Sequence, residues 1–172
     1  MTLTTIDIPQ ADVLWDVARV PEAVLRGAAT TETIGAYIGA KGARQGLYYT
    51  RAARVLGLVG NMAPDGTVEL TTYGRAFAQY DRNSQIMAMR RLLRECEPTR
   101  SVIMALRDGV GLDWHAIAAI LQELAPLAES TAQRRARTAA AWLCSAGLGV
   151  WRDGKLFYQT STRGSGGAAL RN

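Results

Sequence analysis

The chain has 172 residues, of which 48% are hydrophobic and 20% are charged, and this composition is typical of a globular protein. No apolar run approaches the roughly 20 residues that span a bilayer, and the N-terminal sequence MTLTTIDIPQAD lacks the basic start and apolar centre of a secretory signal. We therefore expect a cytoplasmic protein without membrane contact. Cys96 and Cys144 have no CxxC or Cys/His grouping around them, which argues against a disulfide framework and a zinc site.

The net charge of +5 is carried by the second half of the chain. Residues 1–80 hold seven Lys or Arg and seven Asp or Glu, whereas residues 81–172 hold thirteen and eight. Two basic segments, 41–54 and 134–137, contain no acidic residue. Most of their cations are arginines, and the planar guanidinium group suits contacts to phosphates and base edges.

Three helices are predicted in the first half. Pro21 suits the first turn of a helix over 21–28, and a Thr-rich cap precedes a second helix over 30–40. The basic segment RQGLYYTRAARVLGLV (44–59) has the apolar rhythm of a third helix, which follows a turn at Gly42. This is the order of a helix-turn-helix.

A β-hairpin is predicted to follow. The segments 56–62 and 67–74 favour two short strands, and Asp65 and Gly66 supply the turn between them. A helix-turn-helix followed by a hairpin is a winged helix.

The basic helix has two distinct faces. Its predicted core face carries Tyr49, Ala52, Ala53 and Leu56 at helical spacing. The opposite face carries Arg44, Leu47, Arg51 and Arg54, with Tyr48 at the boundary. Arginines often only solvate a helix surface, but acidic residues normally alternate with them there, and this face has none.

The second half repeats this plan without repeating the sequence. A connecting amphipathic helix over 83–96 precedes a short helix that starts near Pro98. The predicted elements after it are a helix over 113–124 capped by Asp113, a helix over 130–147 capped by Ser130 or Thr131, and strands over 148–151 and 155–158 around an Asp-Gly turn.

The long second-half helix also divides into two faces. The predicted buried face carries Ala132, Ala136, Ala139, Ala140 and Leu143. The predicted outward strip carries Thr131, Arg134, Thr138 and Ala141, flanked by Arg135 and Arg137.

We therefore expect a mainly α protein with small β-hairpin wings, built from two tandem winged helix-turn-helix modules. The predicted boundaries are 1–80 for the first module, 81–160 for the connecting helix and second module, and 161–172 for a flexible tail. Two basic, acid-free third helices in equivalent positions favour binding of double-stranded DNA, because such a helix fits the major groove. Lys41 would add to the first basic helix, and Arg152 and Lys155 of the second wing would lie along the DNA backbone.

The segments RQGLYYTRAARVLGL, ELTTYG and STAQRRARTAAAWL, in this order and spacing, resemble tandem winged-helix DNA-recognition regions of restriction-modification and phage-defence proteins. The resemblance covers roughly residues 20–158. It implies a recognition subunit or domain whose partner is a nuclease or another defence subunit. The DNA-facing positions that it implies are Arg44, Gln45, Tyr48 and Arg51, then Arg134, Arg135 and Thr138. Gln45 departs from the outward face and suits the start of the helix instead.

No complete catalytic motif is visible, so we expect no enzyme activity and no cofactor or metal. Asp153, Gly154 and Lys155 match half of a nuclease site, but Asp-Gly is also the expected turn pair of the second wing. His115 is the single histidine, and no phosphate-binding glycine motif is present. The alternatives are a winged-helix transcriptional regulator, or an adaptor that docks an acidic protein through Leu47, Tyr48 and the arginines.

Overall fold

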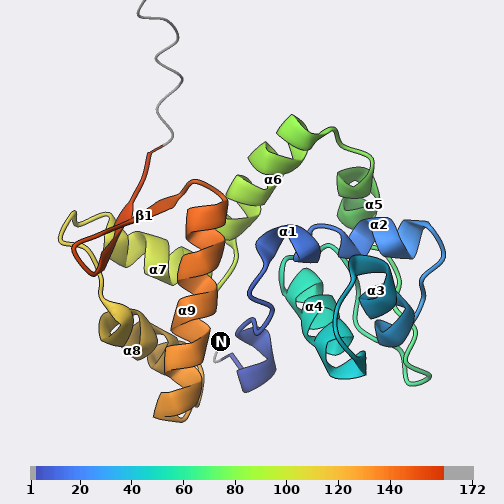
Figure 1. The fold of residues 1–172 in the computed structure, drawn as a ribbon, viewed down its shortest axis with the longest axis horizontal. Coiled ribbons are helices and arrows are strands. Elements are labelled where there is room, and N and C mark those ends of the chain that lie inside the picture. Colours follow the sequence, from blue (N-terminus) through green and yellow to red (C-terminus); the bar gives the residue numbers. More distant parts are fainter. Residues whose placement is uncertain (1–2, 161–172) are drawn as a thin grey trace, which may run out of the picture.

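A computed structural model describes residues 3–160 as a mainly helical protein with a small antiparallel hairpin (Figure 1). In chain order the elements are η1 (Thr5–Asp7), α1 (Leu14–Val17), α2 (Val20–Leu25), α3 (Thr31–Ile38), α4 (Ala43–Val55), α5 (Thr72–Ala78), α6 (Arg82–Glu95), α7 (Thr99–Leu106), α8 (Trp114–Leu124), α9 (Glu129–Ser145), β1 (Gly149–Arg152) and β2 (Lys155–Tyr158). The predicted tail over 161–172 lies outside the described residues. Within 3–160 no helix is long and apolar enough to cross a membrane.

Most of the predicted helices are confirmed, together with two of their caps. The Thr30 hydroxyl accepts from the Thr33 N–H at 3.3 Å at the start of α3, and the Asp113 carboxylate accepts from the Ala116 N–H at 2.8 Å at the start of α8. The predicted cap of α9 is wrong. This helix starts at Glu129, and its N-cap is Ala128, which lies two or three residues before the predicted caps and makes no side-chain capping bond.

The first predicted hairpin is only partly confirmed. Its chain segments approach each other in an isolated antiparallel bridge between Val59 and Leu70, without forming regular strands. The end of the predicted second strand is instead the start of α5, because the Thr71 hydroxyl accepts from the Gly74 N–H at 2.8 Å and caps that helix. Gly74 packs against the backbone of Leu58, where a Cβ atom would have no room.

The second predicted hairpin is confirmed. Strands β1 and β2 pair antiparallel around the Asp153-Gly154 turn, where φ is +48° and +74°, as the Asp-Gly pair predicts. Leu112, just before α8, pairs with Leu156 through two backbone hydrogen bonds of 2.9 and 2.7 Å. This short bridge attaches the hairpin to the helices.

The two halves have their elements in the same order. In the first half, α2 is followed by a bridge from Thr30 to Thr67, then by α3, α4 and the Val59–Leu70 pairing. In the second half, α7 is followed by the Leu112–Leu156 bridge, then by α8, α9 and the β1–β2 hairpin. Helices α4 and α9 therefore hold equivalent places in this order.

One contiguous core joins the two halves. Residues 8–12 run between α4 and α9 (Figure 1) and are hydrogen-bonded to both helices. The buried Trp142 indole N–H of α9 donates to the Ala11 carbonyl at 2.8 Å, and the Tyr49 hydroxyl of α4 donates to the Asp12 carboxylate at 3.3 Å. This N-terminal segment therefore bridges the two helices.

The core face predicted for α4 is confirmed, since Tyr49, Ala52, Ala53 and Leu56 are all buried. Gly46 lets α4 approach α3, because a Cβ atom there would lie inside the van der Waals distance of the Thr31 carbonyl oxygen. The close contact at Gly46 is therefore a requirement of helix packing.

We expect Gly46→Ala to lower the free energy of unfolding by about 2 kcal/mol or more, because the added methyl group overpacks rigid backbone. Urea denaturation would measure the loss. Gly39→Ala is the matched control: Gly39 has φ of +77° and open space around it, so its substitution should cost only about 1 kcal/mol. Equal losses at the two positions would contradict this account of the α3–α4 contact.

Candidate nucleic-acid interface

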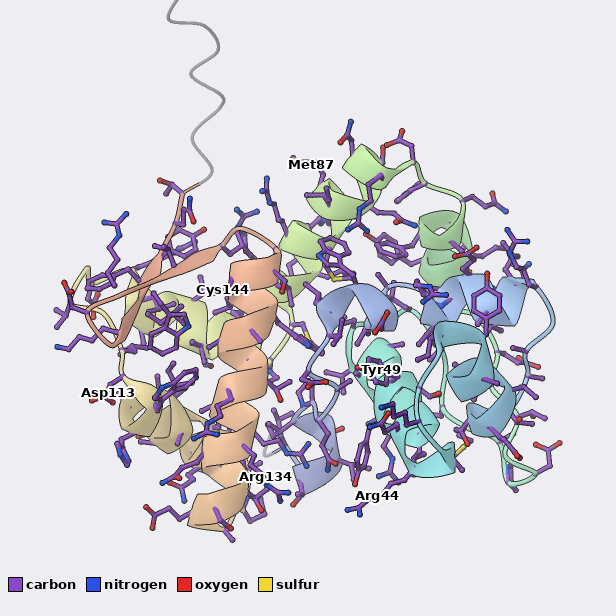
Figure 2. The ribbon with its side chains drawn as sticks, viewed as in Figure 1. Arg44, Tyr49, Met87, Asp113, Arg134 and Cys144 are labelled. Carbon is purple, nitrogen blue, oxygen red and sulfur yellow. The ribbon has the colours of Figure 1, made fainter. Side chains whose placement is uncertain are left out.

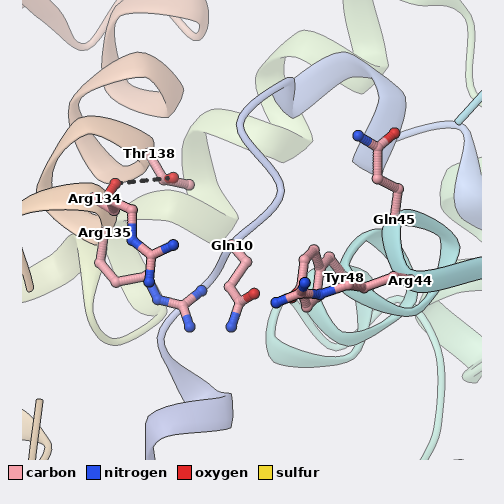
Figure 3. Close-up of a pocket in the computed structure, with 7 residues that line it drawn as sticks. All are labelled: Gln10, Arg44, Gln45, Tyr48, Arg134, Arg135 and Thr138. Carbon is pink, nitrogen blue, oxygen red and sulfur yellow. Dashed lines mark hydrogen bonds between the residues drawn. The ribbon is translucent and has the colours of Figure 1, made fainter. Parts of the chain in front are cut away.

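A polar cleft of about 420 Å³ lies between α4 and α9, with the N-terminal segment as its floor (Figure 3). Its lining residues are Gln10, Arg44, Gln45, Tyr48, Arg134, Arg135 and Thr138. Among residues 3–160, those that line the cleft contribute three guanidinium groups and no carboxylate. The structure thus brings together residues from the two basic segments, which lie about 90 positions apart in the sequence.

On the α4 side, Arg44 and Tyr48 form one unit. The Arg44 guanidinium lies over the Tyr48 ring, 5.4 Å from its centroid, and its Nε–H donates to the Tyr48 hydroxyl. Gln45 stands at the helix start, as expected, where its side-chain oxygen accepts from the Lys41 N–H at 2.7 Å. In Figure 3 the Gln45 amide points away from the other lining side chains, so Arg44 and Tyr48 dominate this wall.

On the α9 side, the predicted outward strip is wrong in part. Arg135 and Thr138 are buried, with 4% and 7% exposure, whereas Arg134 is exposed. The reason is that this side of α9 faces the N-terminal segment rather than solvent. The buried face predicted for α9 is confirmed, since Ala132, Ala136 and Leu143 are all buried.

Arg135 is a buried cation without a carboxylate partner. Among residues 3–160 no Asp or Glu oxygen lies within 4 Å of its guanidinium. Burial, with a smaller contribution from the neighbouring charge of Arg134, lowers the pKa of Arg135 to about 10. The side chain still carries its charge at neutral pH, and its guanidinium faces the cleft.

Gln10 connects the two walls of the cleft. The Gln10 amide is assigned the orientation in which its oxygen faces donors and its nitrogen faces an acceptor. The oxygen then accepts from Nη1 of Arg135, at 3.0 Å, and from Nη2 of the same side chain. The nitrogen donates to the Tyr48 hydroxyl at 3.1 Å. Figure 3 shows Gln10 between Arg135 on one side and Tyr48 on the other. Sequence reasoning missed Gln10, because nothing in the segment before the first helix indicates that it lies between two later helices.

The other predicted site residues do not line this cleft. Arg54 pairs with the Asp7 carboxylate at 2.8 Å, so the acid that its own segment lacks comes from η1. Arg51 lines a separate hollow beside Met62, and Arg137 lies 6.0 Å from the ring centroid of Trp114. The remaining predicted residues are exposed or half-buried elsewhere: Lys41, Thr131, Arg152 and Lys155.

The partial nuclease motif is a turn. Asp153 occupies the β1–β2 turn with positive φ, and Lys155 begins β2 opposite Arg152. Within residues 3–160 no three His, Cys, Asp or Glu side chains gather as metal ligands.

Among residues 3–160, five arginines outside the cleft form ion pairs and others, such as Arg51 and Arg152, form none, so the cleft is distinguished by the convergence of three guanidinium groups from two helices. Ion pairs within residues 3–160 join Arg19 to Asp16, Arg26 to Glu22, Arg54 to Asp7, Arg91 to Glu95 and Arg100 to Glu97. Arg44, Arg134 and Arg135 form no such pair with any described residue. A second hollow continues past the cleft and includes Asp12, whose carboxylate accepts from Tyr49. The cleft itself is therefore a region of concentrated positive charge, suited to an anion.

Most of the chain matches one protein family. Residues 20–144, from α2 to the last turn of α9, match the family described as Domain of unknown function (DUF7226). The chain belongs to this family. No curated protein and no solved structure matched it. The matched range includes both walls of the cleft and leaves Gln10 outside it.

We expect Arg135→Met to raise the free energy of unfolding by about 1–3 kcal/mol, because an apolar side chain of similar length replaces a buried charge without a counter-charge. The cost of burying the Arg135 charge applies at all pH values near neutrality, since the pKa of about 10 keeps the guanidinium protonated there. Thermal denaturation at low salt would measure it. A marked loss of stability would instead indicate that Arg135 holds the fold together.

Proposed function

We propose that the chain is a double-stranded DNA-binding protein that uses the face between α4 and α9. The observation that carries the proposal is the convergence of Arg44, Arg134 and Arg135 on one carboxylate-free cleft. Arg44 comes from α4 and Arg134 from α9 (Figure 2), and these two helices hold equivalent places in the element order of the two halves. We further propose that these halves are tandem winged helix-turn-helix modules, with α4 and α9 as their recognition helices.

The chemistry of the cleft suits a nucleic-acid backbone and base edges. Guanidinium groups donate several hydrogen bonds in a plane, which matches phosphate oxygens and the acceptor pair of guanine. Arg134 and Arg44 are exposed at the rim, so they can reach a ligand too large to enter the cleft. Arg152 and Lys155 at the exposed hairpin turn would add backbone contacts.

The shared cleft limits how the two helices can dock on DNA. Successive major-groove segments on one side of a duplex lie about 34 Å apart, whereas Arg44 and Arg134 line the same cavity of about 420 Å³. The proposal is therefore that both helices contact one segment of DNA, on either side of a groove or backbone, rather than two successive groove segments.

The biological setting follows from the sequence resemblance. We propose a recognition subunit or domain of a restriction or defence system, with sequence preference and with any nuclease on a partner. A transcriptional regulator would use the same interface. Both roles require DNA binding, so this is the first property to test.

Protein docking is the second candidate. A small hollow is lined by Leu47 and Arg51 and by the exposed side chains of Ile6 and Met62. This lining suits an apolar peptide segment that carries an acidic residue. Such docking buries apolar surface, so it should depend on salt much less than DNA binding, where counterions are released.

The test is fluorescence anisotropy with a randomised duplex pool, followed by selection and sequencing of the bound fraction. We expect Arg44→Ala plus Arg134→Ala to weaken binding at least about tenfold. The slope of log affinity against log salt should fall by about 1.8, or 0.9 for each lost phosphate contact.

Arg91→Ala plus Arg100→Ala is the matched control. It removes the same charge from two exposed arginines that pair with neighbouring glutamates. This control should change affinity by much less than the cleft variant. Binding by the unsubstituted protein no tighter than about 100 µM at physiological salt would contradict the proposal.

A further inference from the structure

Among residues 3–160, no carboxylate forms an ion pair with Arg135. Its nearest neighbours along α9, at helical spacing, are Thr131, Ala132, Thr138 and Ala139. The N-terminal segment contributes the neutral Gln10, and the facing α4 contributes the Arg44–Tyr48 unit. Burying a cation is costly unless an anion accompanies it, so this environment suits an external anion.

The arrangement of donors favours a tetrahedral oxyanion. Arg134 and Arg135 reach the cleft from α9 and Arg44 reaches it from α4, so guanidinium groups approach from opposite sides (Figure 3). A planar carboxylate offers two oxygens in one plane, whereas a phosphate group offers acceptor oxygens in several directions. Two walls of donors therefore match phosphate better.

The Gln10 amide shows where such an oxygen would lie. Its one oxygen accepts from both Nη atoms of Arg135, so it occupies the position where an oxygen of a bound phosphate would meet the same two donors. A neutral amide oxygen is a weaker acceptor for a guanidinium than an anionic one. An entering phosphate can therefore take these donors and release Gln10, whose nitrogen keeps the Tyr48 hydroxyl as its partner.

We infer that the floor of the cleft is a phosphate-binding site, with Arg135 as its buried contact and Gln10 as the acceptor that the phosphate replaces. The inference rests on the proposed function, because it assigns one backbone phosphate of the bound DNA as the ligand. This phosphate becomes buried on binding, whereas Arg44 and Arg134 contact the DNA at the exposed rim of the cleft.

The first arm of the test uses inorganic phosphate and thermal unfolding at constant ionic strength, with chloride as the reference anion. Phosphate that binds the folded protein raises its Tm by mass action. We expect Tm to rise with phosphate for the unsubstituted protein and for Arg91→Ala, and to stay constant for Arg135→Met. An equal rise in Arg135→Met would overturn the inference.

Arg135→Lys provides a second variant that keeps the charge. Lysine lacks the planar fork that binds an oxyanion through two parallel hydrogen bonds. We expect this variant to fold and to lose most of the phosphate-dependent rise in Tm. A full rise in Arg135→Lys would indicate a general charge effect and would count against the site.

The second arm identifies the source of the phosphate. Duplexes carrying one neutral methylphosphonate at successive backbone positions are titrated against the unsubstituted protein and Arg135→Met. We expect a methylphosphonate at one backbone position to weaken binding of the unsubstituted protein at least about tenfold. The same duplex should bind Arg135→Met as tightly as the unmodified duplex does. Phosphate protection without any such position would overturn the assignment to DNA and would indicate a free phosphorylated ligand.

The two proposals fail in different ways. DNA binding that depends on Arg44 and Arg134 but is equally strong in Arg135→Met would overturn the buried phosphate site and leave the proposed function standing. Absence of DNA binding by the unsubstituted protein would overturn the proposed function itself.

Discussion

The packing of the N-terminal segment between α4 and α9 is the constraint on which the candidate site depends. Trp142 and Tyr49 hold this segment from opposite sides through Ala11 and Asp12. Because the segment separates the helices, their basic faces border a cleft instead of packing together. The same segment covers Arg135 and supplies Gln10, so it determines both the burial of the cation and its hydrogen-bond partner.

The amino-acid composition of both helices makes this arrangement possible. Helix α9 is rich in alanine, so it can pack closely against α8 on one side and accept the N-terminal segment on the other. Helix α4 has Gly46 where it meets α3. Small side chains at these contacts leave the longer ones, above all Tyr48 and Arg135, to shape the cleft. We expect the unpaired charge at the cleft to oppose stability, as charges at ligand-binding sites often do.

Interactions between neighbouring residues explain which predictions succeeded. The caps of α3 and α8, the core face of α4 and the Asp153-Gly154 turn each depend on residues within one or two helical turns of one another. Local rules failed where two of them competed. The segment 67–74 has strand-forming residues, but Thr71 also caps a helix, and packing of Gly74 on Leu58 favours α5.

The sequence by itself determined the helical class, most of the helix boundaries, the second hairpin and the two basic helices, because these follow from periodicity, capping and turn chemistry over short distances. The tertiary structure alone decided which basic residues act together. Arg54 forms an ion pair with Asp7, 47 positions away in the sequence, whereas Arg135 forms none with any described residue. Periodicity places a side chain on a face of its helix, but what that face meets depends on chain segments that are distant in sequence and close in space.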